Sequence, residues 1–199
     1  MRLSSIEEFT RLNERVTFLS QEEEDLTRSS ERLKEVIASL DAVMGERFMV
    51  GFHEVRAAFQ GMVSRLFGGA TSRLSLSEKD KPLESGIEID VQPVGKRLQN
   101  ISLLSGGERA LVAIALVCAV LKVKPTPFCV LDEIDAPLDD ANVERLISVL
   151  RELSLLTQFL LITHTKGTML AADVLYGVTM PELGVSKVLT VRVAELASS

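Results

Sequence analysis

The chain has 199 residues, of which 46% are hydrophobic, and its formal net charge is −6 at pH 7. This length and composition allow one domain with a buried core and an appendage, and the negative charge excludes attraction of the whole chain to nucleic acid. Any contact with DNA must then be local, at charge pairs such as Lys79/Lys81 or Lys96/Arg97, although such pairs are usually solvated surface.

The cysteines and the apolar runs indicate the compartment. Cys118 and Cys129 lie inside apolar runs without CxxC spacing, which predicts free, buried thiols, a reducing compartment and no zinc site. The longest apolar run, residues 110–121, is too short to span a bilayer, and no signal peptide precedes the first charged helix. We therefore expect a cytoplasmic protein with no membrane contact.

A repeat with alternating three- and four-residue steps runs from Phe9 to Met44. Nine of its eleven positions are apolar, and polar residues fill most of the space between them. A 3.5-residue period sustained this long predicts a coiled-coil helix, about 48 Å from Leu12 to Met44. The sequence has no second run of this kind, so the partner helix must come from another polypeptide or another copy. The alternative is an isolated long helix on a globular domain.

Beyond this repeat the apolar positions become bulky and aromatic and continue to Leu66, which predicts that the helix enters a globular core. Gly45 and Gly51 are predicted weak points where the helix can bend. Gly68 and Gly69 are suited to a left-handed cap at its end. Two alternating runs then predict a hairpin or two edge strands: 73–77 and 87–91.

Ser105-Gly106-Gly107-Glu108 has the Ser-x-x-Glu spacing of a capping box ahead of an apolar helical run. The N-terminus of such a helix, with its unpaired backbone N–H groups, is a site for an anion. Two glycines after the cap are costly unless something approaches the backbone closely. A capping box alone would serve any buried helix, so the motif by itself is only moderately specific.

The run Pro127 to Leu131 is almost entirely apolar, as is typical of a central strand in a parallel sheet. It ends in Asp132 and Glu133, at the sheet edge where α/β folds bind their ligands. One carboxylate can hold Mg²⁺, and the next can act as general base for an attacking water. Because this pair follows the glycine-rich cap, it predicts a site for a nucleotide γ-phosphate and its Mg²⁺.

Two further segments extend the predicted site. Residues 137–142 predict an acidic N-cap for a helix over 141–153. Residues 158–164 predict a second apolar strand that ends in His164. On the same sheet edge as Asp132, this histidine can donate a hydrogen bond to a phosphate oxygen. Two alternating strands, 174–180 and 185–193, are predicted to close the chain. A turn over 181–184 joins them, and residues 194–199 are predicted to form a tail.

The sequence contains no Gly-x-x-x-x-Gly-Lys-[Ser/Thr] motif. Gly95-Lys96 lacks both the upstream glycine and the hydroxyl residue. The backbone cradle for the β- and γ-phosphates is therefore missing. We expect that this chain is not a complete ATPase.

Taken together, the heptad helix, LLSGGERAL, FCVLDEIDAPLDDANV, QFLLITHTKGTM and ADVLYGVTM with GVSK resemble the C-terminal head segment of bacterial SMC (structural maintenance of chromosomes) proteins over residues 5–193. The resemblance implies an α/β fold: the C-terminal lobe of an ABC-type ATPase head with a long N-terminal coiled-coil helix. We divide the chain accordingly into a coiled-coil arm, a coil-to-head helix with a small hairpin, the C-terminal lobe and a tail: 1–47, 48–95, 96–193 and 194–199.

The resemblance also implies residue roles. Asp132 matches the Walker B aspartate that binds the metal, Glu133 the catalytic glutamate and His164 the switch histidine. The signature that reaches the nucleotide of an opposing head is matched by Ser105, Gly106, Gly107 and Glu108. Asp139 lies in the D-loop, 136–140, at the head–head contact and is a further predicted cofactor-binding residue. Pro137 stands where alanine is expected, which bears only on the flexibility of that loop.

The implied activity is ATP-dependent head engagement and hydrolysis, with Mg²⁺, that drives chromosome condensation and segregation. The implied partners are the P-loop-bearing N-terminal head segment of the same protein, a second SMC head, DNA, and a ScpA-type kleisin subunit bound through its C-terminal winged-helix domain. Two alternatives stay open: a DNA-repair ABC ATPase of the Rad50 or RecN type, and a structural coiled-coil module. The GVTM-to-GVSK ending favours SMC, and the intact Asp132-Glu133 pair argues against a structural remnant.

Overall fold

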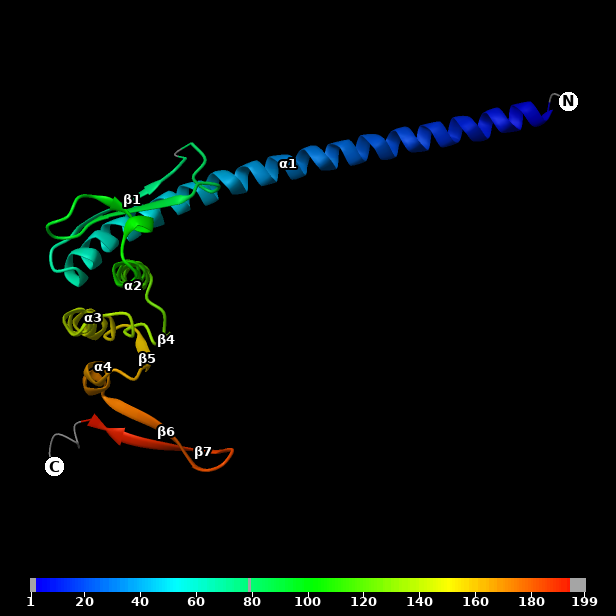
Figure 1. Ribbon diagram of the computed structural model, residues 1–199. Coiled ribbons are helices and arrows are strands. Elements are labelled where there is room, and N and C mark those ends of the chain that lie inside the picture. The colour runs from blue at the N-terminus through cyan, green and yellow to red at the C-terminus, as the bar shows by residue number, and fades with distance from the viewer. Residues whose placement is uncertain (1–2, 79, 194–199) are drawn as a thin grey trace. The chain divides into compact units, whose positions relative to one another are not determined.

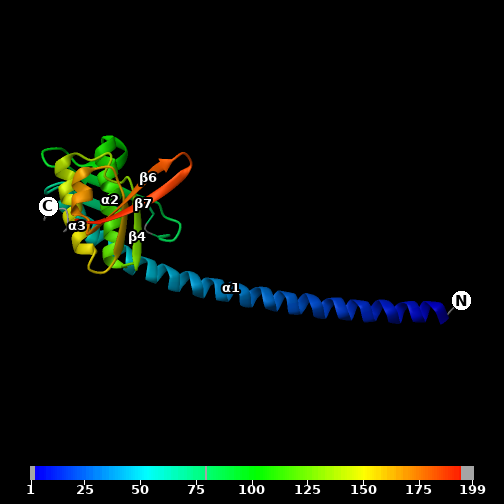
Figure 2. The same ribbon diagram turned by 90° about the horizontal axis from the view of Figure 1, so that it is seen from below.

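The computed structural model describes residues 3–78 and 80–193, so Lys79 and the predicted tail, 194–199, lie outside the described residues. The chain forms two compact units, Met1–Val50 and Gly51–Ser199. A single helix, α1 (Leu3–Leu66), begins in the first unit and ends in the second (Figures 1 and 2). It stays helical through Gly45 and Gly51, the predicted weak points. A glycine costs a helix only about 1 kcal/mol relative to alanine, which so long a helix tolerates.

The first unit carries the predicted heptad stripe on its surface. Each of its apolar side chains is at least 54% exposed: Phe9, Leu12, Val16, Leu19, Leu26, Leu33, Ile37, Leu40 and Met44. An apolar stripe of this length on one helix is a surface that a second helix would bury.

In the second unit α1 turns its apolar face into the core. Phe59, Val63 and Leu66 are fully buried. The helix then ends in a Schellman motif, in which the Gly69 N–H donates to the Ser64 carbonyl at 2.7 Å and Gly68 has a φ of 67°. A positive φ at this position strongly favours glycine, so the predicted left-handed cap is confirmed.

A three-stranded antiparallel sheet follows, in the order β1 (Thr71–Leu76), β2 (Ile87–Gln92) and β3 (Gln99–Asn100). The predicted hairpin is therefore correct, with Leu74 opposite Ile89. One face of β1 is buried, as its alternation predicts. The short strand β3 and the 3-10 helix η1 (Ile101–Leu103) were not predicted.

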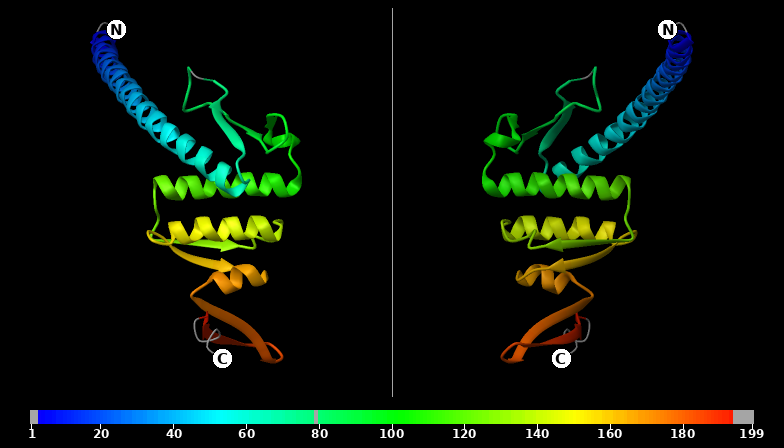
Figure 3. Two further views of the ribbon diagram at one scale, coloured as in Figure 1. Left: turned by 90° about the vertical axis from the view of Figure 1, so that its left-hand side faces the viewer. Right: turned by 90° about the vertical axis from the view of Figure 1, so that its right-hand side faces the viewer.

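The rest of the second unit alternates helices and strands: α2 (Gly106–Val123), β4 (Phe128–Asp132), α3 (Asp140–Leu153), β5 (Gln158–Ile162) and α4 (Lys166–Ala171). Figure 3 shows α2 beside α3, and α3 and α4 contact each other on one side of the β4–β5 pair (Figure 1). Apolar side chains of α3 meet the inner face of the strand pair, where Leu146 and Leu150 lie beside Leu131 and Leu161. The mixed helix and strand content matches the predicted α/β class.

β4 and β5 are parallel, with Asp132 opposite Ile162. Their burial differs from the expectation of a central strand buried on both faces. Along both strands half-buried residues alternate with exposed ones, and the exposed face carries four apolar side chains: Phe128, Val130, Leu160 and Ile162. The described residues supply a covering layer for one face only. The apolar composition therefore indicates a second covering layer that the described part of the chain does not provide.

The closing hairpin pairs β6 (Val174–Glu182) with β7 (Val185–Arg192) in a separate two-stranded sheet. β6 is two residues longer than predicted, because Pro181 and Glu182 belong to the strand, and the turn has Gly184 at a φ of 83°. Alternating strands usually bury one face, but here nearly every residue of both strands is exposed.

The two cysteines are free thiols, as predicted. Cys118, on α2, is buried and Cys129, on β4, is half-buried. Burial raises the pKa of the Cys118 thiol to about 11, so this thiol stays protonated and unreactive at neutral pH.

The buried end of α1 gives a stability prediction. We expect Phe59→Ala to lower the free energy of unfolding by about 3–5 kcal/mol, because the side chain is fully buried and its loss leaves a cavity. Phe128→Ala is the matched control, since Phe128 is 68% exposed, and should change the stability of this chain by no more than about 0.5 kcal/mol. Urea unfolding followed by circular dichroism measures both. Equal effects of the two variants would contradict the core assignment.

Candidate functional site

The predicted capping box at the start of α2 is present. Ser105 is the N-cap, and its side chain accepts a hydrogen bond from the Glu108 N–H while the Glu108 carboxylate accepts from the Ser105 N–H at 3.0 Å. The Ser105 hydroxyl also donates to that carboxylate at 2.8 Å. The cap therefore fixes the first turn of α2 and directs the positive end of an 18-residue helix outward.

Lys96 completes this cap, which the sequence did not indicate. Its ammonium lies 2.8 Å from the Glu108 carboxylate. The hydrogen bonds from Lys96 and Ser105 lower the pKa of Glu108 to about 2, so this carboxylate is ionised at neutral pH. Lys96 was a candidate for DNA contact, but here its ammonium forms an ion pair with the Glu108 carboxylate. Lys81, of the other candidate pair, lies 3.4 Å from Glu84.

Gly107, the second glycine of the predicted signature, lies where a larger residue would clash. A Cβ added to Gly107 would lie 3.2 Å from the carbonyl oxygen of Pro137, closer than a side chain normally allows. The N-terminus of α2 is thus packed against the predicted D-loop, segments that are 30 residues apart in sequence (137 minus 107). A Cβ added to Gly106 would meet no atom within 4 Å, so nothing in the structure explains that glycine.

The predicted carboxylates and histidine meet at one edge of the β4–β5 pair. Asp132 ends β4, and the Glu133 N–H extends the ladder by donating to the Ile162 carbonyl at 2.8 Å. Glu133 has a φ of 47°, in the left-handed region, which redirects the chain at this point. The Nδ1 atom of His164 lies 3.8 Å from the Glu133 carboxylate. This is too long for a hydrogen bond but close enough for both groups to face one small ligand.

Asp139 has a structural partner. It is the N-cap of α3, and its carboxylate accepts a hydrogen bond from the Asn142 N–H at 2.8 Å. The predicted acidic cap is therefore present. The cap uses one carboxylate oxygen. Of the other residues in the predicted D-loop, Leu138 is half-buried and the rest are exposed.

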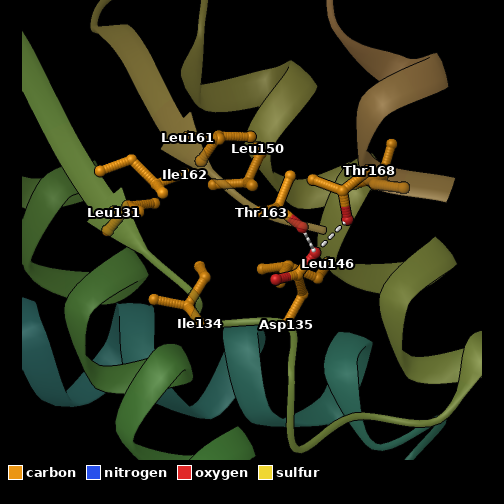
Figure 4. A pocket seen from close by; sticks show the side chains of 10 residues that line it. Leu131, Ile134, Asp135, Leu146, Leu150, Leu161, Ile162, Thr163 and Thr168 are labelled. Atoms are coloured by element: carbon orange, nitrogen blue, oxygen red, sulfur yellow. Dashed lines mark hydrogen bonds between the residues drawn. The ribbon is translucent and has the colours of Figure 1, made fainter. Parts of the chain in front are cut away.

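A buried carboxylate that we did not single out lies beneath these residues. Asp135 is 2% exposed and accepts hydrogen bonds from the hydroxyl groups of Thr163, at 2.6 Å, and Thr168 (Figure 4). Burial raises its pKa, but the hydrogen bonds outweigh burial and leave that pKa below its ordinary value. The sequence gives one indication that Asp135 is buried: it is an acidic residue among the mostly apolar residues 134–138 that follow β4.

Two features bear on what this edge can bind. Within residues 3–78 and 80–193, no group of three or more His, Cys, Asp and Glu side chains converges as a metal site would require. A hard cation held by Asp132 would therefore need its other oxygen ligands from water, a nucleotide or another chain. None of the helices in the described part of the chain is both long and apolar enough to cross a membrane.

The sequence matches known proteins along most of its length. Residues 11–187 match the family described as RecF/RecN/SMC N terminal domain. The chromosome partition protein Smc of Bacillus subtilis (strain 168) is 53% identical over 195 residues, which are 98% of this chain. The chain spans only 16% of the length of that relative.

Solved structures give the same result. A Smc head domain with an extended coiled coil, derived from Pyrococcus furiosus and bound to the C-terminal domain of ScpA, matches 98% of this chain and 49% of its own, with a TM-score of 0.75 and 35% identity. A structure from work on ATP-driven dimerization and DNA-stimulated activation of SMC ATPases covers 77% of this chain and 93% of its own, with a TM-score of 0.69 and 39% identity. The chain therefore belongs to the RecF/RecN/SMC family and is a head segment of the SMC type, as its motifs predicted.

Proposed function

We propose that this chain supplies the C-terminal part of an SMC ATPase head, which engages a second head and hydrolyses ATP in chromosome partition. The observation that carries the proposal is the meeting of Asp132, Glu133 and His164 at the carboxyl end of two parallel strands. Parallel α/β sheets bind ligands at this end, and the three side chains are the types that metal binding and water activation require. The match to SMC heads over most of the chain supports the same reading.

Each site residue has a role in this proposal. Asp132 is exposed at the strand end and can be one ligand of Mg²⁺. The bound ion would contact the nucleotide phosphates and neutralise their charge. Glu133 takes a proton from the attacking water. His164 donates a hydrogen bond to a phosphate oxygen.

The signature lies at a second position and, in this proposal, binds the nucleotide held by an opposing head. Ser105 caps this turn, and Gly106 and Gly107 present their backbone N–H groups at the positive end of α2. Glu108 keeps this turn in shape through its contacts with Ser105 and Lys96. The close approach of the Pro137 carbonyl to Gly107 supports a role for Asp139, in the same loop as Pro137, on the engaging surface.

The exposed face of β4 and β5 supports an N-terminal segment of the same protein as a partner. Phe128, Val130, Leu160 and Ile162 form a contiguous apolar face on a strand pair of the type that is normally covered on both sides. The sequence also lacks a P-loop, which such a segment would bring. The apolar stripe of the first unit supports a second helix of the coiled coil in the same way.

We further propose the division into a coiled-coil arm over 1–47, a coil-to-head region over 48–95 and the C-terminal lobe over 96–193. The partners in the full complex are a second SMC head, DNA and a ScpA-type kleisin, and the place of action is the nucleoid in the cytoplasm. ScpA is bound in the solved relative from Pyrococcus furiosus. A RecN-type role in DNA repair is the second candidate, but the identity to chromosome partition proteins favours the first.

The uncovered strand face gives a first prediction. We expect Phe128→Asp to weaken binding of the purified N-terminal head segment at least about 10-fold, because a carboxylate would be buried in an apolar contact. The control is Phe18→Asp, since Phe18 is 59% exposed on α1 and lies off the heptad stripe. Isothermal titration measures both affinities. Equal affinity for Phe128→Asp and the unaltered chain would place that segment elsewhere.

The strand-end carboxylate gives a second prediction. The chain alone should not turn over Mg-ATP, and a head reconstituted with the N-terminal segment should. In that head Glu133→Gln keeps the shape but removes the base, and we expect hydrolysis to fall about 10²- to 10⁴-fold while ATP still drives dimerisation.

Ser105→Arg separates engagement from chemistry. It should abolish ATP-driven dimerisation and leave nucleotide binding by the P-loop intact, because a bulky cation fills the anion site. Turnover assays and light scattering on a sizing column give both readouts. Normal dimerisation of the arginine variant would refute the role of the signature, and full activity of Glu133→Gln would refute that of the glutamate.

The closing hairpin gives a third prediction, on the kleisin. Val188 pairs with Val178 and Leu189 pairs with Gly177, so the two neighbours point to opposite faces. Both are exposed, at 59% and 46%. We expect this chain alone to bind the C-terminal winged-helix domain of the kleisin, and one of Val188→Asp and Leu189→Asp to weaken binding more than the other, because a docked partner covers one face.

Isothermal titration measures these affinities, and circular dichroism checks that each variant is folded. Unchanged affinity in both folded variants would exclude the hairpin faces as the docking surface.

A further inference from the structure

The loop that carries His164 and the turn that carries Glu133 are tied to one buried carboxylate. We propose that Asp135 is a positioning residue, which fixes the Thr163–Thr168 segment against the turn after β4 and thereby sets the separation of His164 and Glu133. The proposal concerns placement of the two side chains. Its effect on catalysis rests on the proposed function.

The carboxylate holds both ends of the segment that contains His164. Thr163, directly before His164, donates to the Oδ2 atom of Asp135 at 2.6 Å, and Thr168, within α4, donates to the same oxygen. The Thr163 hydroxyl also accepts from the Thr165 N–H at 2.9 Å, which braces the chain across His164. Thr165 is the N-cap of α4 but makes no side-chain cap of its own. The hydroxyl of Thr163 therefore links the residues on both sides of the histidine to Asp135.

Two backbone hydrogen bonds hold the turn around Asp135. The Ala136 N–H donates to the Glu133 carbonyl at 3.2 Å, and the Leu138 N–H donates to the Asp135 carbonyl at 3.0 Å. These two bonds fold the turn between Glu133 and the D-loop. One residue thus joins three segments: the turn after β4, the D-loop and the His164 loop.

Packing cannot place His164 and Glu133, because their side chains are 72% and 63% exposed. Their 3.8 Å separation therefore depends on where the two backbones are held. The Glu133 N–H bond to the Ile162 carbonyl fixes one side of the strand ends, and the Asp135 cluster fixes the loop beyond them.

The surroundings of the cluster strengthen it. Asp135, Thr163 and Thr168 line a small cavity whose other walls are apolar side chains (Figure 4). These walls are Leu131, Ile134, Leu146, Ile147, Leu150 and Leu161, and Ile162 borders the cavity at the end of β5. Hydrogen bonds to a charged group shielded from water are stronger than exposed ones, and leaving such a group with one donor fewer is costly. The cluster is therefore a rigid anchor rather than a loose polar contact.

Thr163→Val tests the proposal, because it replaces the hydroxyl by a methyl group of similar size. Thr163→Ser restores the hydroxyl. Thr168→Val is the matched control, which removes a donor to the same oxygen at the far end of the segment, within α4 rather than next to the histidine. If Thr163→Val does not fold, Thr163→Cys, with its weak donor, takes its place.

The first readout uses the 199-residue chain by itself. Its two histidines are His53 and His164, so the ring resonances of His53, on α1, are an internal reference in the NMR spectrum. We expect Thr163→Val to shift the His164 resonances and to speed amide exchange over residues 163–168, and Thr163→Ser to do neither. Unchanged His164 resonances and exchange in folded Thr163→Val would overturn the proposal.

The second readout is turnover in the reconstituted head. We expect Thr163→Val to lower kcat about 10- to 100-fold, as for a misplaced catalytic group, with KM for ATP changed by less than about 2-fold. Thr163→Ser should restore kcat, and Thr168→Val should lower it less than Thr163→Val does. An equal loss of thermal stability in the two valine variants with kcat unchanged would show a structural role only. If the unaltered head lacks turnover, the proposed function fails, and the first readout alone decides the placement.

Discussion

Parallel pairing of β4 with β5 is the constraint on which the candidate site depends. Parallel strands bring their carboxyl ends to one edge, and here the register sets Asp132 beside Ile162. Glu133 and Thr163 then leave the sheet together, and His164 follows one residue later. A shift of one residue would turn the half-buried face of the pair outward and separate the carboxylate from the histidine. The same contact thus sets the core face and the chemistry.

The buried Asp135 carboxylate is the second constraint, and it acts through the first. A charge removed from water destabilises a fold unless hydrogen bonds replace its solvation. Two threonine hydroxyl groups from the segment after β5 supply them. The same bonds that satisfy this charge also hold the loop of His164. Stability of the core and geometry of the site are therefore coupled at one residue.

Three surfaces of the described residues are more apolar than a solvated surface needs to be: the heptad stripe of α1, the outer face of β4–β5 and the β6–β7 hairpin. Each surface suits a different kind of partner: a second helix for the stripe, a covering layer for the strand face and a docked domain for the hairpin. The cap of α2 differs from them, because its N–H groups present a positive end suited to an anion. Apolar assembly surfaces and the polar binding edge are thus separate parts of the chain.

The local elements followed from the amino-acid sequence because their signals are local. The heptad stripe, the glycines after Leu66, the capping box at Ser105 and the alternation of the hairpins each depend on residues a few positions apart. The motifs also indicated the family, because SGGE, LDE and a strand followed by THT occur in this order along the chain.

What lies across the fold was decided only by the tertiary structure. Three contacts join residues that are 12, 30 and 28 positions apart in sequence (108 minus 96, 137 minus 107, 163 minus 135). They are the ion pair of Lys96 with Glu108, the close approach of Pro137 to Gly107, and the hydrogen bond from Thr163 to Asp135. No periodicity in the sequence reports such pairs, since they depend on how loops meet. The burial of β4 differed from the prediction for the same reason: burial on both faces was expected, and the described residues cover one face only. An apolar strand records that both faces are to be buried, but which segment buries each face depends on the arrangement of elements far apart in the chain.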